Sequence, residues 1–326
     1  MTEHDGRPVT RLGLQIPSFT YPGVSDAELF GRVAEIAQTA EDAGFDSVWV
    51  MDHFYQIGFQ GKRHEAMHEC YTLLGGIAAR TTQVRLGALV TGVTYRNPAL
   101  LAKMVTTLDI VSSGRAVLGI GAAWNEDEHR GYGFDFPPVS ERFERLEEAL
   151  QICRAMFREE TPSFTGKHYR IEEALNFPRP VQSGGPPILI GGSGERRTLR
   201  LVAQYADACN LFGDAATVKH KLDVLRRHCE DLGRDPAEIT KTRLGGLVIA
   251  PTHEEAERRG EELKAARGLT DEWYRASQIV GDPEEVAQKV QGLLDAGLDG
   301  VMFNMWRVQD LEPVALAGQT LSKLLA

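Results

Sequence analysis

The chain has 326 residues, of which 42% are hydrophobic and 25% charged, as in an ordinary globular protein. Its 36 basic and 46 acidic residues give a formal net charge of −10. This balance argues against non-specific binding of nucleic acid, which needs a basic face to displace phosphate counterions.

Segments for export or membrane insertion are not expected. The polar N-terminus lacks the apolar core of a signal peptide, and no apolar run approaches the ~18 residues of a membrane span. The four cysteines lie far apart without a CxxC pattern, which fits a reduced compartment and no zinc ribbon. They are Cys70, Cys153, Cys209 and Cys229. We therefore expect a cytoplasmic protein.

Eight short apolar runs alternate with longer stretches of helical period. In chain order they are Leu12–Pro17, Ser47–Met51, Arg85–Thr91, Ala116–Gly121, Ile188–Gly191, Ala208–Phe212, Leu244–Ala250 and Gly300–Asn304. Their near-continuous hydrophobicity is typical of strands covered on both faces, and hence of a parallel sheet.

Helix start and stop signals stand between these runs. Starts are predicted at Ser25 with Glu28, at Thr252 with Glu255, and at Asp282 followed by Pro283. Gly44 and Gly297 stand where a helix end favours a left-handed residue.

The alternation of strands and helices predicts an α/β protein, specifically a closed (β/α)8 TIM barrel. One internal echo supports a repeated unit, because EDAGFD at 41–46 returns as LDAGLD at 294–299, each before an apolar run. Two stretches break the rhythm, at about 161–187 and 265–280, and are predicted to be insertions at the rim. We expect one domain over residues 1–326.

The residues just after the strands are the candidates for chemistry, because active sites of such barrels lie at the carboxyl ends of the strands. His53 is the only histidine immediately beyond a predicted strand, and Asp52 precedes it. A histidine there is suited to exchanging a proton, with its charge set by the carboxylate. The alternative is a structural histidine, hydrogen-bonded in the rim.

A second candidate is the turn Gly191-Gly-Ser-Gly-Glu195, which follows an apolar run and opens a helical pattern. Free amides at a helix start predict an anion site, with phosphate as the expected group. Arg196, Arg197 and Arg200 add cationic side chains nearby. The alternative is a tight turn that only needs small residues.

Two other patterns are weaker. The segment Gly119–Asn125 lacks the third glycine and the ribose-binding acid of a dinucleotide site. His64–His68 matches HExxH, but no third ligand follows at a suitable distance, so no metal is predicted.

Taken together, the chain resembles the bacterial luciferase-like monooxygenase superfamily, in particular the branch that uses the deazaflavin coenzyme F420. The resemblance rests on AEDAGFDSVWVMDH at 40–53, RLGALVTGVTYRNP at 85–98, TLDIVSSGRAVLGIGAAWN at 107–125, PILIGGSG at 187–194 and GDPEEV at 281–286. It implies a barrel whose strand ends hold a flavin-type cofactor.

The resemblance also implies roles for single residues. Asp52 and His53 match residues that border the ring system, and the histidine is often assigned to proton transfer. The stretch Leu89–Thr91 matches a bulge that commonly contains a non-proline cis peptide, and Asn125 matches a residue at the ring edge or ribityl chain. The predicted catalytic residue is His53, and the predicted cofactor-binding residues are Asp52, Leu89, Val90, Thr91, Asn125, Gly191, Gly192, Ser193 and Gly194.

One position departs from the pattern. Relatives that oxidise a sugar phosphate carry a glutamate as general acid where this chain has Ala122. We expect hydride transfer between F420 and an unidentified small organic substrate. The alternatives are an FMN-dependent monooxygenase served by a separate flavin reductase, and a cofactor-free barrel. Relatives are often homodimers.

Overall fold

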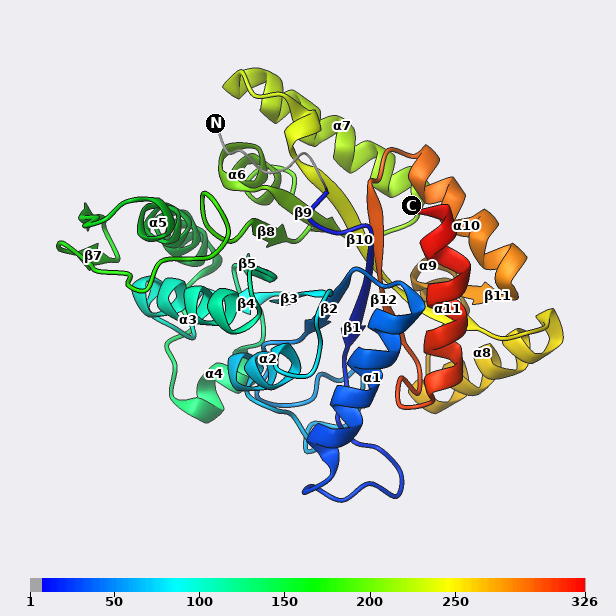
Figure 1. Ribbon diagram of the computed structural model, residues 1–326. Helices are drawn as coiled ribbons and strands as arrows, with labels where there is room; N and C mark the ends of the chain where they lie inside the picture. Colours follow the sequence, from blue (N-terminus) through cyan, green and yellow to red (C-terminus); the bar gives the residue numbers. More distant parts are fainter. Residues whose placement is uncertain (1–7, 326) are drawn as a thin grey trace.

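A closed barrel of eight parallel strands forms the centre of the computed structural model, which describes residues 8–325 (Figure 1). Around the barrel the order is β1, β2, β3, β5, β8, β9, β10 and β12, and β12 pairs again with β1. The bounds are β1 (Leu12–Ile16), β2 (Ser47–Val50), β3 (Arg85–Ala88), β5 (Ala116–Gly121), β8 (Ile188–Gly191), β9 (Ala208–Leu211), β10 (Thr240–Ile249) and β12 (Gly300–Met305). The TIM-barrel prediction is confirmed, and each predicted run overlaps one barrel strand.

Helices surround this barrel on its outer side (Figure 1). They are α1 (Leu29–Ala43), α2 (Cys70–Ala78), α3 (Pro98–Val111), α4 (Glu126–Tyr132), α5 (Val139–Arg158), α6 (Thr198–Tyr205), α7 (Ala215–Leu232), α8 (His253–Arg267), α9 (Asp271–Ser277), α10 (Pro283–Asp295) and α11 (Leu311–Leu324). A 3-10 turn covers Pro236–Glu238. The buried strand residues that face these helices are almost all aliphatic or aromatic, which explains the near-continuous apolar runs.

Side-chain caps begin two of the three helices predicted from start signals. Asp282 and Glu285 form a complete capping box at α10, and Thr252 accepts a hydrogen bond at the start of α8. The third signal differs. The carboxylate of Glu28 accepts from the amide and hydroxyl of Ser25, but α1 begins after this turn without a side-chain cap.

The two copies of the repeated sequence, at 41–46 and 294–299, form the same kind of turn between a helix and a strand. Gly44 and Gly297 have φ values of 99° and 108°, which favour glycine. The aspartate that ends each repeat then holds a neighbouring strand. Asp46 accepts from the amide of Arg11 at 2.6 Å beside β1, and Asp299 accepts from the amide of Lys241 at 2.8 Å in β10.

Trp49 fills part of the barrel interior, and its indole is fully buried among aliphatic side chains from other strands. Glycines make room for it, because a Cβ at Gly13 would lie 3.0 Å from the indole nitrogen and one at Gly87 would lie 2.6 Å from a ring carbon. The barrel is therefore a packed core, and binding is confined to its ends.

The predicted insertions carry secondary structure. The first contains an antiparallel hairpin of β6 (Phe164–Thr165) and β7 (Arg170–Ile171). The second covers the end of α8, all of α9 and most of β11 (Gln278–Gly281), which pairs with β10 and extends the barrel wall. A short strand β4 (Thr91–Gly92) pairs with β5.

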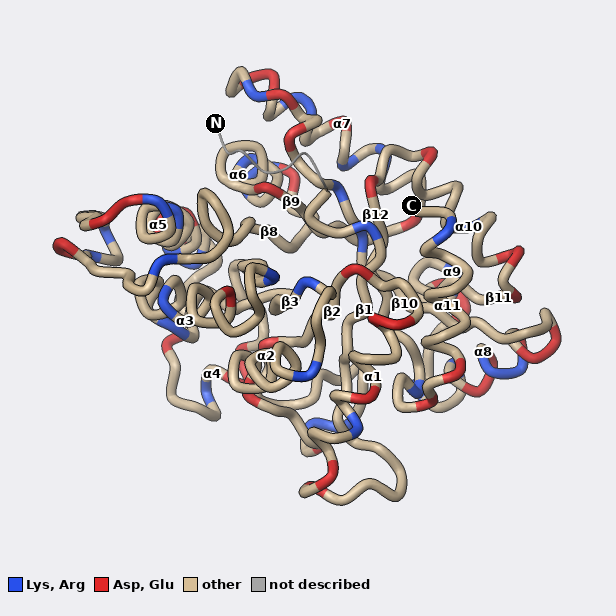
Figure 2. Tube along the Cα trace, in the orientation of Figure 1, with Lys and Arg blue, Asp and Glu red and all other residues tan. Residues whose placement is uncertain are grey.

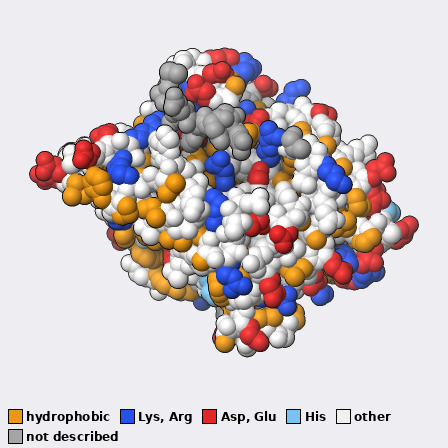
Figure 3. Space-filling model, in the orientation of Figure 1, with side chains coloured by type: hydrophobic (Ala, Val, Ile, Leu, Met, Phe, Trp, Pro, Cys, Tyr) orange, Lys and Arg blue, Asp and Glu red, His pale blue; other side chains and the backbone are white. Residues whose placement is uncertain are grey.

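Acidic and basic residues are interspersed over the helices and loops (Figures 2 and 3). None of the helices in residues 8–325 is long and apolar enough to cross a membrane. All four cysteines are buried and unpaired.

Candidate active site

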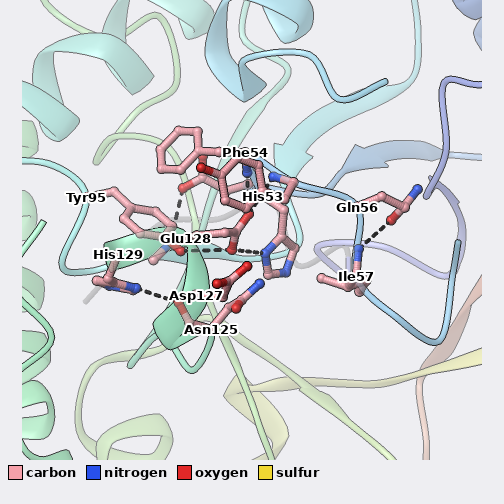
Figure 4. Close-up of polar contacts among 12 residues, drawn as sticks. His53, Phe54, Gln56, Ile57, Tyr95, Asn125, Asp127, Glu128 and His129 are labelled. Carbon is pink, nitrogen blue, oxygen red and sulfur yellow. Dashed lines mark hydrogen bonds and ion pairs between the residues drawn. The ribbon is translucent and has the colours of Figure 1, made fainter. Parts of the chain in front are cut away.

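His53 lies just beyond β2 and pairs with a carboxylate that the sequence did not point to. Its Nδ1 is 2.7 Å from Oε2 of Glu128 (Figure 4). The His53 side chain is 15% exposed, whereas that of Glu128 is completely buried. A carboxylate only accepts hydrogen bonds, so Nδ1 carries the proton and Nε2 stays free for exchange.

Glu128, in the first turn of α4, is held by several donors besides His53. It accepts from the amides of Phe54 and Tyr55, the latter at 2.8 Å, and from the Tyr95 hydroxyl at 3.2 Å. Burial alone would raise the pKa of Glu128, but the hydrogen bonds and the charge of His53 outweigh it, so the pKa lies below its ordinary value. The group therefore remains an anion at neutral pH.

Asp52 has a different partner from the predicted one. It forms a two-pronged ion pair with Arg96, at 2.7 and 3.0 Å, and accepts from the amide of Gly92 at 3.2 Å. Arg96 also reaches Glu69 at 2.7 Å. The expected pairing of Asp52 with His53 is not observed, because the Asp52 carboxylate is engaged in fixing the loop around β4.

The segment Leu89–Thr91 lies against the ends of the neighbouring strands. Its Leu89–Val90 peptide is cis, as the resemblance implied, and the carbonyl of Leu89 accepts from Gln15 Nε2 at 2.8 Å. A Cβ added to Gly121 or Gly191 would lie 2.8 Å from Val90. The glycines therefore let Val90 pack between the ends of β5 and β8.

Aromatic side chains stand beside His53. Trp124 is 57% exposed, and its ring meets His53 edge-on with the centroids 5.5 Å apart, while Phe59 stacks on Trp124 with the centroids 6.4 Å apart. Asn125 follows at the N-cap of α4, and its carbonyl accepts from His129 Nδ1 at 2.7 Å (Figure 4). The Asn125 side chain makes no capping hydrogen bond, so its amide is available to a ligand.

The glycine turn after β8 lies next to the turn after β9. Gly192 has a φ of 122° and donates to the carbonyl of Asn210 at 3.0 Å, and Ser193 Oγ accepts from the amide of Phe212 at 3.1 Å. Residues 195–197 form a separate turn before α6 begins at Thr198. The predicted helical pattern after the glycine turn is confirmed, with one turn between the glycines and the first residue of α6.

The three predicted arginines face α5. Arg196, Arg197 and Arg200 line a cavity with Ser140 and Phe143, between α5 and the start of α6. All three arginines are exposed. Their charges therefore lie largely in water.

The HExxH segment lies in the loop between β2 and α2. Its His68 packs edge-on against Phe19 at 5.0 Å, and the Nε2 of His68 has no hydrogen-bond partner. Within residues 8–325 no group of three or more histidine, cysteine, aspartate or glutamate side chains is arranged to hold a metal ion.

Comparison with known proteins gives consistent results for the family and the fold. Residues 10–262 match the family described as luciferase-like monooxygenase. The F420-dependent glucose-6-phosphate dehydrogenase of Kineococcus radiotolerans is 32% identical over 313 residues, which cover 86% of this chain and 89% of that protein. The enzyme of the same name from Amycolatopsis mediterranei is 30% identical over 314 residues, covering 86% and 90%.

Solved structures share the fold at lower identity. A coenzyme F420-dependent tetrahydromethanopterin reductase from Methanopyrus kandleri has a TM-score of 0.78 and 18% identity, covering 95% of this chain and 98% of that one. An F420-dependent secondary alcohol dehydrogenase in complex with an F420-acetone adduct has a TM-score of 0.79 and 20% identity, covering 97% and 99%. The oxygenating constituent of 3,6-diketocamphane monooxygenase from Pseudomonas putida, in complex with FMN, has a TM-score of 0.78 and 19% identity, covering 97% and 98%.

Proposed function

Because this chain belongs to the luciferase-like monooxygenase family, we propose that it is an oxidoreductase that transfers a hydride between coenzyme F420 and a small organic substrate. The identity of about a third to F420-dependent dehydrogenases, over 86% of the chain, supports the choice of cofactor. The single observation that carries the proposal is the His53–Glu128 pair beside the exposed ring of Trp124, at the carboxyl ends of the strands.

The residues at this end of the barrel fit a flat, phosphorylated cofactor. Val90 packs on Gly121 and Gly191 and offers an apolar edge against which a ring can lie. Asn304, near the end of β12, shares the inward face of Met302, and its Oδ1 is buried without a hydrogen-bond partner. Ser193 lies in the turn proposed for the phosphate. A buried polar atom without a partner is costly, so a ligand group that donates to Asn304 would stabilise the site.

F420, when bound, supplies the ring carbon that gives or accepts the hydride. The chain supplies orientation, exclusion of water and proton transfer. His53 exchanges the proton at Nε2, while Glu128 holds the ring through Nδ1 and fixes its orientation. Trp124 and Phe59 form an aromatic wall that limits water around His53.

The substrate is proposed to differ from that of the named relatives. A methyl group at Ala122 cannot donate a proton, so His53 is the remaining acid–base group at this site. We expect little or no oxidation of glucose 6-phosphate by the natural chain, and a gain of this activity in Ala122→Glu. Efficient oxidation of glucose 6-phosphate by the natural chain would contradict this assignment.

The cofactor is tested by titrating the purified protein with F420 and with FMN while following tryptophan fluorescence. We expect micromolar binding of F420 and a reduced signal change in Trp124→Phe, because that indole is at the proposed site. Binding of FMN without binding of F420 would instead favour the monooxygenase that depends on a flavin reductase. Absence of both would favour a cofactor-free barrel.

The role of His53 is tested by replacing it. His53→Ala is expected to lower turnover at least ~100-fold with an unchanged circular dichroism spectrum, as for loss of acid–base catalysis. The matched variant His53→Asn keeps a hydrogen bond to Glu128 but cannot carry a proton, so it should be equally impaired. Unchanged turnover in both variants would remove His53 from the mechanism.

We also propose a cytoplasmic homodimer. The four buried thiols fit a reducing compartment, and homodimers are common in the family that the chain resembles. Sedimentation equilibrium of the purified protein measures the assembly directly, and a monomer at all concentrations would contradict it.

A further inference from the structure

Arg243, in β10, is a buried cation without a hydrogen-bond partner. It is only 4% exposed, and its backbone pairs beside Leu211 and Val301, whose side chains belong to the apolar core. Its Nε is enclosed and makes no hydrogen bond. Within residues 8–325, its terminal nitrogens form neither a hydrogen bond nor an ion pair, but unlike Nε they are not fully enclosed, so a ligand can reach them. Such a charge is strongly unfavourable inside a protein unless an opposite charge reaches it.

The acidic group whose charge acts on Arg243 is already used elsewhere. Asp214 attracts the guanidinium from a distance, but its Oδ1 accepts from the amide of Thr217 at 2.8 Å as the N-cap of α7. Burial lowers the pKa of Arg243 to about 10, and Asp214 opposes this only in part. The guanidinium is thus charged at neutral pH and lacks a counter-ion of its own.

The guanidinium lies at a gap in the barrel wall. On this edge of β10, the pairing with β9 ends at Arg243 and the pairing with β11 begins at Gly246. Leu244 and Gly245 therefore have no strand partner on that side. A Cβ at Gly245 would overlap the guanidinium, so the glycine leaves space for it.

Two further features at this place favour a negative charge. The N-terminus of α7, an 18-residue helix, begins at Ala215, directly after the N-cap residue that acts on Arg243. The preceding loop is joined to the glycine turn of β8, because Phe212 donates to Ser193 Oγ at 3.1 Å. The gap is therefore at the same end of the barrel as the proposed phosphate turn.

We propose that Arg243 forms the cationic floor of an oxyanion-binding site at this gap, next to the N-terminus of α7. The ligand is a phosphate or carboxylate group, carried by the substrate or cofactor or bound as a free anion. It pairs with the guanidinium and replaces the missing hydrogen bonds. The site does not depend on the identity of the redox cofactor.

The test measures thermal unfolding of the natural chain and of Arg243→Met with inorganic phosphate, with succinate, and with sodium chloride at matched ionic strength. We expect phosphate or succinate at tenfold excess over its Kd to raise the Tm of the natural chain by about 2 °C. Arg243→Met should lose this rise. Without anions it should be at least as stable as the natural chain, because an apolar side chain of similar length replaces an uncompensated charge.

Arg80→Met is the matched control, since Arg80 is an exposed arginine just after α2 and lies outside both the glycine turn and the arginine-lined cavity, and it should retain the full rise. No rise in the natural chain, or an equal rise in Arg243→Met, would overturn the proposal. A less stable Arg243→Met with an unchanged response to anions would show that Arg243 is purely structural, and would overturn it as well.

Binding of F420 to the same variants identifies the source of the oxyanion. A loss of tenfold or more in F420 affinity in Arg243→Met, together with competition by phosphate, would assign the group to the cofactor. Unchanged F420 affinity with an Arg243-dependent phosphate effect would assign it to the substrate or a free anion. A chain that binds phosphate through Arg243 but does not bind F420 would refute the proposed function and leave the anion site intact.

Discussion

Replacing Glu128 with glutamine tests whether this buried carboxylate sets the proton position on His53. Glutamine has the same shape, so its oxygen can still accept from the amides of Phe54 and Tyr55. Its NH2 group would then face His53 Nδ1, and two donors cannot share that contact. The proton of His53 must then move to Nε2. A protonated Nε2 can no longer accept a proton from a ligand.

The magnitude follows from the contact that is lost. A hydrogen bond to a charged group contributes about 1.5–3 kcal/mol, and each 1.4 kcal/mol corresponds to tenfold in rate. We therefore expect Glu128→Gln to lower kcat/KM by about 10- to 100-fold. The free energy of unfolding should fall by about 2 kcal/mol at neutral pH.

The pH dependence has a definite sign. The pKa of Glu128 is lowered from its ordinary value of 4.5, so its contribution to stability is complete above that pH and is lost as the pH falls through the lower folded pKa. The difference in unfolding free energy between the natural chain and Glu128→Gln should therefore shrink below about pH 4.5.

Nitrogen NMR of histidine-labelled protein provides an assay that needs no substrate. The His53 signal, identified by its loss in His53→Asn, should report a proton on Nδ1 in the natural chain and on Nε2 in Glu128→Gln. An unchanged tautomer together with unchanged kcat/KM would refute the assigned role of Glu128.

Three other contacts give predictions that urea unfolding can check. Arg96→Ala leaves Asp52 buried without a counter-ion and should cost about 3–5 kcal/mol, whereas Arg96→Lys should cost less; equal stability of all three forms would contradict the ion pair. Glu41→Gln replaces the carboxylate that accepts from three consecutive amides ahead of β3 with a neutral amide, and should lower the free energy of unfolding by about 1–3 kcal/mol at pH 7. Because the pKa of Glu41 is lowered, this effect should be smaller below pH 4.5. Gly13→Ala places a methyl group against Trp49 and should cost about 1–3 kcal/mol, and a variant as stable as the natural chain would show that the barrel interior has spare space.

The sequence alone was sufficient for the barrel and for the placement of its strands. Strand hydrophobicity, the glycine turns and the helix caps are local signals, and each acts through neighbouring residues in the chain. The largest differences are at the start of β10, predicted at Leu244 rather than Thr240 because Lys241 and Arg243 interrupt the apolar pattern, and at the end of β3, which stops at Ala88 rather than Thr91. The cis peptide at Leu89–Val90 came from the family resemblance and not from any local preference.

Partner choice was decided by the tertiary structure. His53 precedes Glu128 by 75 residues and follows Asp52 directly, so adjacency in the sequence suggested the wrong carboxylate. The packing of α4 against the loop after β2 brings Glu128 to Nδ1, while Arg96 takes Asp52. The gap at Arg243 likewise exists only because β9 and β11 meet the same edge of β10 at different heights. Local patterns determine which segments become strands, whereas pairing between distant side chains depends on the closure of the barrel, which no single segment encodes.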